Sequence, residues 1–330
     1  MQIGAVLPHN EIGTDPGAIK AYLQGVEDLG MTHLLIYDHV MGADPDRPGG
    51  FNGPYDHNVA FHEPFTFFAF AAAVTERIEL VTTVMILPQR QTVLAAKQAA
   101  EVALLSNNRL RLGVGTGWNQ VEYTALNEEF SNRGKRQEEQ VELMRKLWSE
   151  HSFTYNGRYH TIEAASILPR PSRPVPIWFG GSAPALLDRC ARLGDGWMPL
   201  GGANDKSRAQ LEEIRAKRTA HGLSMDGFGV QAQAQWGGGN PERWRSHAAT
   251  WKDIGATHMA VATHNAGPTD VDGHLARIAE YRDAMASIAG GPALRPPCRH
   301  PRPAAPAGHT AVSQPATRPT KTCPPPAGGR

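Results

Sequence analysis

The chain of 330 residues is 41% hydrophobic and carries 33 Lys and Arg against 32 Asp and Glu. This length permits two domains, although a single α/β barrel commonly spans about 250 residues, and the apolar content is sufficient for a large core. No apolar run approaches the roughly 20 residues of a membrane-spanning helix, and the N-terminus shows no secretory pattern. Three cysteines are too few for a disulfide scaffold. We therefore expect a cytoplasmic protein without a membrane partner.

Apolar strands alternate with helical segments along the chain. In chain order, the sequence predicts strand 3–7 and helix 16–29, strand 33–37 and helix 64–75, strand 78–85 and helix 92–105, strand 110–114 and helix 137–148, strand 175–179 and helix 183–192, strand 196–199 and helix 205–220, strand 229–234 and helix 241–253, and strand 257–262 and helix 271–287. Strict alternation predicts a parallel sheet with right-handed crossovers, and eight units favour a closed barrel. The expected fold is therefore α/β, a (β/α)8 TIM barrel.

Three segments interrupt this alternation. A Gly-, Pro- and Asp-rich stretch, 41–62, follows the second strand, a polar loop, 119–135, follows the fourth, and 153–160 is expected to form a hairpin around Asn156-Gly157. Loops as long as 41–62 are usually functional or disordered, so we expect a barrel with elaborated βα loops in which the two long loops shape the binding pocket.

The C-terminal end differs in composition from the rest. Residues 291–330 hold six Lys or Arg, no Asp or Glu, and eleven of the 26 prolines. We therefore expect 289–330 to be a disordered Pro/Ala/Arg-rich tail and 1–288 to be the folded domain. Because acidic residues outnumber basic ones in the folded part, we expect no nucleic-acid partner.

The fourth strand ends in three alternating glycines, Gly113, Gly115 and Gly117. Glycine lets a backbone turn sharply or approach a ligand closely, so this strand is expected to end at a binding surface. The spacing is not that of the dinucleotide-binding fingerprint, since the third glycine is misplaced and no helix follows at once.

In a TIM barrel, catalytic groups lie on the loops that follow the strands. His39, directly after the second strand, either exchanges a proton near neutral pH or is a structural histidine bonded within its loop, and the two readings carry equal weight. Histidines and carboxylates do not share a metal-ligand spacing, so we expect no metal. The other candidate positions on this rim are Pro8–Asn10, Asp38, Thr83–Leu87, Thr116–Trp118, Gly180–Ser182, Pro199–Gly202 and His264-Asn265.

Gly180, Gly181 and Ser182 directly precede the helix over 183–192. Backbone amides exposed at a helix start, together with a serine hydroxyl, would make a phosphate site. An ordinary glycine turn with a serine N-cap explains these residues equally well.

Together these residues resemble the bacterial luciferase-like monooxygenase family, and specifically its deazaflavin (F420)-dependent branch. The resemblance covers roughly 1–285 and is strongest over 63–200. The motifs that carry it are Glu63-Pro-Phe65, Thr82–Arg90, Ala96-Lys97, Leu105-Ser106 with Arg109, Leu112–Trp118, Arg133–Arg136 with Glu138, Phe179–Ser182 and Gly194–Trp197. The chain departs from the family at Asn107-Asn108, which replace two glycines, and in its Pro-rich tail.

The resemblance implies a coenzyme, either F420 (an 8-hydroxy-5-deazaflavin) or FMN, with its ring in the barrel mouth above a non-proline cis peptide between Thr83 and Val84. It also implies that His39 is catalytic and either stabilises negative charge or hands a proton to the substrate. For Trp118, packing within its loop is the alternative to a place in the pocket. The coenzyme-binding residues implied are Asp38, Thr83, Val84, Thr116, Gly117 and Trp118, with Gly180, Gly181 and Ser182 at the phosphate.

The resulting expectation is an oxidoreductase that transfers a hydride between reduced F420 and a small organic substrate, with an F420 or flavin reductase as the hydride source. One alternative is an FMN-dependent monooxygenase that uses O2. Another is a non-catalytic flavin- or deazaflavin-binding protein on the same fold. Dimers are common in the family, so a homodimer is a further expectation, whereas no motif identifies the substrate.

Overall fold

The computed structural model describes residues 1–267 and 270–288, and these belong to one compact unit. The tail expected over 289–330 lies outside the described residues. Among the residues that are described, none of the helices is long and apolar enough to cross a membrane.

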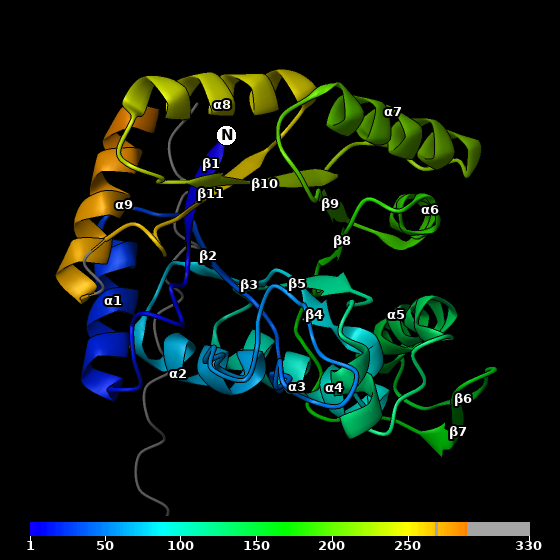
Figure 1. Ribbon diagram of the computed structural model, residues 1–330. Coiled ribbons are helices and arrows are strands. Elements are labelled where there is room, and N and C mark those ends of the chain that lie inside the picture. The colour runs from blue at the N-terminus through cyan, green and yellow to red at the C-terminus, as the bar shows by residue number, and fades with distance from the viewer. Residues whose placement is uncertain (268–269, 289–330) are drawn as a thin grey trace, which may run out of the picture. The chain divides into compact units, whose positions relative to one another are not determined.

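Eight parallel strands form a closed barrel, which confirms the predicted fold class (Figure 1). Each strand pairs with the barrel strand that follows it along the chain. The last strand pairs with the first, where His258 lies opposite Gln2, and this pairing closes the barrel. The strands are β1 (Gln2–Val6), β2 (His33–Ile36), β3 (Glu79–Thr82), β5 (Leu110–Gly115), β8 (Ile177–Gly180), β9 (Gly196–Met198), β10 (Gly229–Gln235) and β11 (His258–Ala262).

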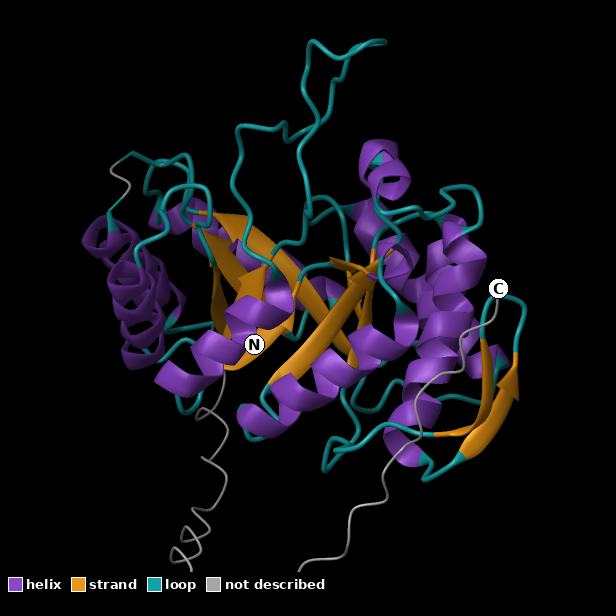
Figure 2. Cartoon of the chain, turned by 90° about the horizontal axis from the view of Figure 1, so that it is seen from below, coloured by secondary structure: helices purple, strands orange, loops and turns teal. Residues whose placement is uncertain are grey.

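One helix follows each barrel strand and packs on the outside of the ring, as Figures 1 and 2 show. The helices are α1 (Pro16–Asp28), α2 (Pro64–Val74), α3 (Thr92–Leu105), α5 (Arg133–Ser149), α6 (Pro184–Leu193), α7 (Asp205–Ala220), α8 (Pro241–Ile254) and α9 (Val271–Met285). Most begin in the manner that capping chemistry favours. Side chains of Asp15, Glu63, Asn204, Asn240 and Asp270 each accept a hydrogen bond from a backbone amide in the first helical turn.

Three local predictions were inaccurate. The strand expected over 78–85 ends at Thr82, the chain then passes through a cis peptide bond between Thr83 and Val84, and pairing with β5 resumes in β4 (Met85–Ile86). The position of this cis bond agrees with the one that the family resemblance implied.

The other two inaccuracies lie in the loops. The second strand of the hairpin is β7 (Thr161–Ala165), which pairs with β6 (Phe153–Asn156) and begins only after 160, so the turn is longer than an Asn-Gly turn. The loop expected over 119–135 contains a short helix, α4 (Gln120–Ala125), and α5 begins at Arg133, earlier than predicted.

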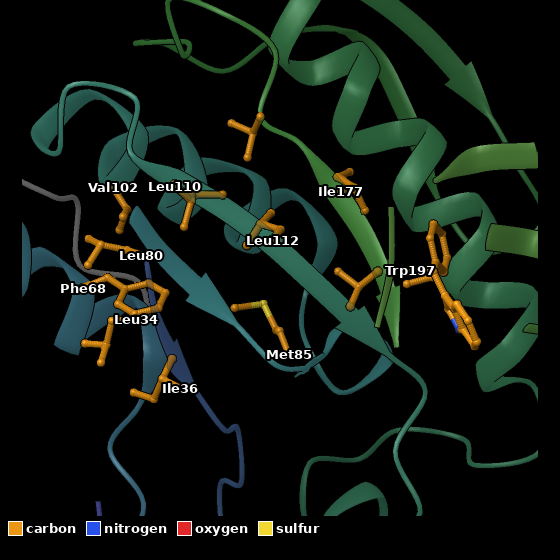
Figure 3. Close-up of a cluster of buried hydrophobic side chains, with 14 of the residues drawn as sticks. Leu34, Ile36, Phe68, Leu80, Met85, Val102, Leu110, Leu112, Ile177 and Trp197 are labelled. Carbon is orange, nitrogen blue, oxygen red and sulfur yellow. The ribbon is translucent and has the colours of Figure 1, made fainter. Parts of the chain in front are cut away.

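Successive residues of each strand point to opposite faces of the sheet and pack into two different hydrophobic clusters. Side chains such as Leu34 and Leu80 point outward and lie beside Phe68 and Val102 of the helices, as Figure 3 shows, and Leu112 belongs to the same outer cluster. The inward positions form a smaller apolar cluster inside the barrel, made by Val6, Leu35, Val81, Trp178, Met198, Ala260 and Ala262. Because both faces of each strand are buried, most of the strands are largely apolar, as is typical of parallel sheets. The clearest exception is β10, which carries Gln231 and Gln233 at alternate positions that face the barrel interior.

Candidate active site

A cavity of about 1350 Å³ opens at the C-terminal ends of the barrel strands. This volume exceeds the ~300–1,000 Å³ of pockets for one drug-sized ligand, so it has room for a coenzyme together with a small second molecule. All of the predicted site residues line it, namely Asp38, His39, Thr83, Val84, Thr116, Gly117, Trp118, Gly180, Gly181 and Ser182.

Two other predicted rim histidines do not line this cavity. His9 is buried behind its wall, where its ring packs against Phe61 (centroids 4.5 Å apart) and Tyr37 (5.3 Å). Burial, with smaller contributions from neighbouring histidines, lowers the pKa of His9 to about 3, so its ring is neutral at physiological pH. His264 also packs against Tyr37, with the ring centroids 6.2 Å apart.

Val84 stands on the floor of the cavity between two strand ends. A β-carbon added at Gly115 of β5 would lie 2.4 Å from Val84 Cγ2, and one added at Gly180 of β8 would lie 2.3 Å from Val84 Cγ1. Carbon atoms normally approach to about 3.5–4.0 Å, so only glycine leaves space for the valine at both positions. The glycines at the ends of these strands therefore set the position of an aliphatic surface inside the mouth.

Thr83, next to this valine, belongs to a polar chain across the barrel. Gln233 of β10 donates from Nε2 to Thr83 Oγ1 (3.3 Å), and the Tyr37 hydroxyl donates to Gln233 Oε1 (3.1 Å). Burial raises the pKa of Tyr37 well above its usual value, so this hydroxyl keeps its proton. The cavity thus combines an apolar floor with a few fixed polar groups, as small-molecule sites usually do.

His39 lies in an aromatic surrounding at one side of the cavity. Its ring centroid is 4.8 Å from that of Phe61, 5.1 Å from that of Tyr55 and 5.7 Å from that of Trp118. Phe61 and Tyr55 come from the long loop expected over 41–62, so this loop covers the histidine. Trp118 stays 41% exposed and contributes to the cavity wall.

The histidine is held by a carboxylate that the sequence did not single out. Glu122 Oε1 lies 3.2 Å from His39 Nδ1 and also accepts from the amides of Val40 (2.9 Å) and Met41 (3.3 Å). Its other oxygen, Oε2, accepts from Gln89 Nε2 (3.1 Å). Burial opposes ionisation of Glu122, but the hydrogen bonds from His39, Gln89 and the backbone outweigh it and lower the pKa of this carboxyl.

Asp38 lies at the cavity, and both oxygens of its carboxylate are bonded to protein groups. Oδ2 accepts from the amide of Ile86 in β4 (2.9 Å), and Oδ1 accepts from Arg90 Nη2 (2.8 Å). Arg90 also donates to Glu63 Oε1 (2.8 Å) at the start of α2. These bonds tie the end of β2 to the segment that follows the cis peptide, so the side chain of Asp38 fixes the shape of the mouth.

The far end of the cavity is formed by the starts of the helices α5 and α6. Ala183 is the N-cap of α6 and Asn132 that of α5, and neither start is capped by a side chain, so the serine cap considered for Ser182 is not present. Their free amides favour a negative group. Gly181 (φ 137°) lets the chain enter α6 in a backbone conformation that other residues rarely adopt.

Two arginines line the same end. Arg189, only 7% exposed, donates from Nε to Glu138 (3.1 Å) and from Nη1 to Gln137 (3.2 Å), whereas its Nη2 has no hydrogen-bond partner within the described chain. Burial lowers the pKa of Arg189, and Glu138 only partly offsets this. Arg133 lies over the Phe130 ring (3.7 Å), and its buried Nε has no partner in the described residues.

Sequence reasoning missed several of these positions. Glu122 lies in α4, which is too short to produce a periodic pattern, and Arg189 lies in the middle of a helix rather than at its start. Arg133 was noted within a motif but was not placed at the cavity. Arg243, Ser246, His247 and Thr250, which line the cavity from one face of α8, carry no motif at all. No group of three or more His, Cys, Asp or Glu among the described residues is arranged to hold a metal.

Comparison with protein families shows a match over residues 1–292 to the model described as luciferase-like monooxygenase. An uncharacterized protein of Mycobacterium tuberculosis is 36% identical over 195 residues, which is 56% of this chain and 67% of that protein. Two functionally named relatives also align, and the aligned segments span only about half of their length.

The first is an F420-dependent glucose-6-phosphate dehydrogenase of Intrasporangium calvum, 34% identical over 53% of this chain and 51% of its own. The second is an FMNH2-dependent dimethylsulfone monooxygenase of Pseudomonas fluorescens, 32% identical over 52% of this chain and 47% of its own. Among solved structures, an F420-dependent secondary alcohol dehydrogenase superposes with a TM-score of 0.70 at 14% identity, covering 87% of this chain and 98% of the other. This last similarity concerns the fold alone.

Proposed function

The chain belongs to the luciferase-like monooxygenase family, whose members include F420- and FMN-dependent oxidoreductases, and we propose that it transfers a hydride between reduced coenzyme F420 and a small organic substrate. The observation that carries this proposal is the convergence of three features on one cavity. These are the aliphatic surface of Val84 framed by glycines, the two uncapped helix starts, and a histidine held by a buried carboxylate.

The floor of the cavity is suited to a flat heterocycle. Val84 would support one face of the ring, and the glycines at the ends of β5 and β8 keep side chains away from it. Thr116, Gly117 and Trp118 would border the ring, and the aromatic surface of Trp118 would contact the ring or the substrate. When bound, the reduced deazaflavin supplies a hydride.

The far end of the cavity is suited to the phosphate of the coenzyme side chain. Ser182 would contact it through its backbone amide and hydroxyl, with the positive end of α6 behind it. The Gly181 amide already donates to the Met198 carbonyl (3.0 Å), so Gly180 and Gly181 would contribute by letting the phosphate approach the backbone closely. Arg189 has a free Nη2 at this end, and Arg133 has a buried Nε without a partner. Both guanidinium groups have protein partners, Glu138 and Gln137 for Arg189 and the Phe130 carbonyl for Arg133, but each keeps one donor unused within the described residues. Two cations with unused donors at one end of the cavity favour an anionic ligand there.

His39 would act at the reacting end. Its Nε2 makes no hydrogen bond within the described residues, and the side chain is 13% exposed, so this nitrogen can reach a bound molecule. In the direction of substrate oxidation Nε2 would accept the proton of the substrate, which leaves both ring nitrogens protonated. In the direction of reduction the doubly protonated ring would return that proton to the substrate from Nε2. Asp38 would act indirectly, by fixing the segment that follows the ring support.

A second candidate function is an FMN-dependent monooxygenase, which the similarity to the dimethylsulfone enzyme favours. FMN shares the tricyclic ring and the phosphate, so the floor and the far end of the cavity would serve both coenzymes. That activity would require O2 and a flavin reductase, whereas deazaflavin reacts poorly with O2.

Titration of the purified protein with reduced and oxidised F420 and with FMN, followed by fluorescence, tests the proposal. Preferential binding of F420 together with substrate-dependent hydride transfer is the expected result. Preferential binding of FMN with O2 consumption would select the second function. Binding of neither coenzyme would refute both.

A further inference from the structure

Glu122 is the most fully bonded carboxylate next to the cavity, yet it lies outside every motif. It is 1% exposed, it comes from α4, and it accepts hydrogen bonds from two loop amides, a glutamine and the His39 ring. Because Glu122 contacts His39, it can influence a bound molecule without touching that molecule itself. Its effect would pass through the single titratable ring that it contacts.

The geometry of this contact determines which nitrogen of His39 carries the proton. An ionised carboxylate is only an acceptor, so Nδ1, which faces Glu122 Oε1, must be the donor. In the neutral ring, Nε2 then carries the lone pair. This nitrogen is the one without a protein partner, on a side chain that lines the cavity.

We propose that Glu122 is the positioning residue for His39, fixing the proton on Nδ1 and presenting Nε2 to the bound substrate. This inference rests on the proposed function for its catalytic consequence, whereas the proton position itself does not depend on any ligand. Glu122 also holds the amides of Val40 and Met41, where the long loop begins, so the same carboxylate sets both the ring and the base of the loop that covers it.

The chain offers a matched control. Glu27 is likewise buried and accepts from the backbone amides of Glu76 (3.0 Å), Arg77 (2.6 Å) and Ile78 (2.8 Å), but it contacts no histidine and does not line the cavity. Replacing Glu27 therefore removes a buried carboxylate that organises a loop, with no route to His39. An effect that appears at Glu122 and not at Glu27 is specific to the ring.

Two substitutions separate packing from positioning. In Glu122→Gln the amide oxygen can still accept from His39 and the loop. The new NH2 group can donate to Gln89 Oε1, which has no partner in the described residues, once the Gln89 amide turns over. Glu122→Ala removes the acceptor altogether. We therefore expect the glutamine to preserve the fold and the proton position, and the alanine to release the ring.

The first measurement is ¹⁵N NMR of the histidine rings in the protein without coenzyme, with His39 assigned among the 14 histidines by the loss of its signals in His39→Ala. The expected result is Nδ1–H in the native protein and in Glu122→Gln, a mixture of tautomers in Glu122→Ala, and no change in Glu27→Ala. Native protein with the proton on Nε2, or an unchanged tautomer in Glu122→Ala, would overturn the proposal.

The second measurement is a double-mutant cycle on hydride transfer. Glu122→Ala should lower kcat roughly 10- to 100-fold, part of the ~10²–10⁴-fold effect of a general acid–base, with KM for the coenzyme little changed and with recovery of most activity in Glu122→Gln. In a His39→Ala background the same change should have almost no further effect. An equal loss in both backgrounds would show that Glu122 is only structural. If no coenzyme supports turnover, the proposed function fails and the NMR result still decides the inference.

Discussion

Gly180→Ala tests whether the floor of the cavity supports the coenzyme. The added β-carbon would lie 2.3 Å from Val84 Cγ1, whereas carbon atoms normally keep about 3.5–4.0 Å, so the valine or the end of β8 must move by more than roughly 1 Å. Overpacking of this kind costs about 1–3 kcal/mol. Because about 1.4 kcal/mol is a tenfold change in an equilibrium constant, the loss is roughly 5- to 150-fold, divided between stability and coenzyme affinity.

The companion variant Val84→Ala/Gly180→Ala removes the obstructing methyl groups. The nearest remaining contact of the new β-carbon is then Val84 Cβ, at 3.4 Å, which is tolerable. We expect the double variant to be no less stable than Val84→Ala alone. Gly202→Ala, where an added β-carbon meets nothing within 4 Å and φ is not positive, controls for adding a methyl group to the mouth.

Denaturant unfolding measures the free energy of unfolding of the native protein, the two single variants at positions 84 and 180, the double variant and the control. Fluorescence titration measures their affinity for the coenzyme. The expected result is a favourable coupling of about 1–3 kcal/mol between positions 84 and 180, summed over the two measurements. Simple addition of the two single losses would refute the steric reasoning. Unchanged coenzyme affinity in both Val84→Ala and Gly180→Ala would refute the role of Val84 as ring support.

Further expected outcomes concern other parts of the site. His39→Ala should lower hydride transfer about 10²–10⁴-fold in stopped-flow assays while coenzyme affinity changes little, and equal loss of both would indicate a binding role only. Arg189→Gln should weaken FMN binding at least about tenfold in titrations but leave riboflavin binding unchanged, since a hydrogen bond to a charged group contributes about 1.5–3 kcal/mol. The pKa of Glu27 is lowered because backbone hydrogen bonds outweigh burial, so its stabilisation is present above its ordinary pKa near 4.5 and is lost as the pH falls through the folded value. Unfolding experiments should therefore find Glu27→Gln less stable at pH 7, with a difference that shrinks below about pH 4.5.

The barrel was predictable because most of its strands are short, largely apolar runs. Leu34, Leu80 and Leu112 face the helices while Leu35 and Val81 face the barrel interior, so these strands are apolar on both faces and distinct from the helical pattern beside them. The position of the site at the C-terminal ends of the strands could be predicted from the fold, because parallel strands bring these ends together. These two facts together placed residues as distant as His39 and Ser182 at the same cavity.

What the sequence did not reveal depends on contacts between distant segments. The residue pattern alone makes Val84 one more residue of an apolar strand, and only the family resemblance placed it at the coenzyme. The space that Gly115 and Gly180 leave for its side chain becomes visible only in the structure. Glu122 reads as a solvent-exposed acid in a polar loop, although it is buried beneath Val40 and Met41. Neither position carries a local signal, because the partner that defines it is more than 30 residues away.

The cavity is formed partly by strand ends and partly by a long loop, and we expect these two parts to control coenzyme binding and substrate selection respectively. Its floor consists of strand ends whose positions are fixed by sheet pairing and by buried bonds such as that from Ile86 to Asp38. The wall around His39 consists of the long loop, whose Phe61 and Tyr55 contact the ring while much of the segment is exposed. Rigid elements hold a coenzyme reproducibly, whereas loops tolerate change. Selection of the substrate should therefore reside in the residues of the loop, and exchange of 44–60 should alter substrate preference while leaving coenzyme affinity nearly unchanged.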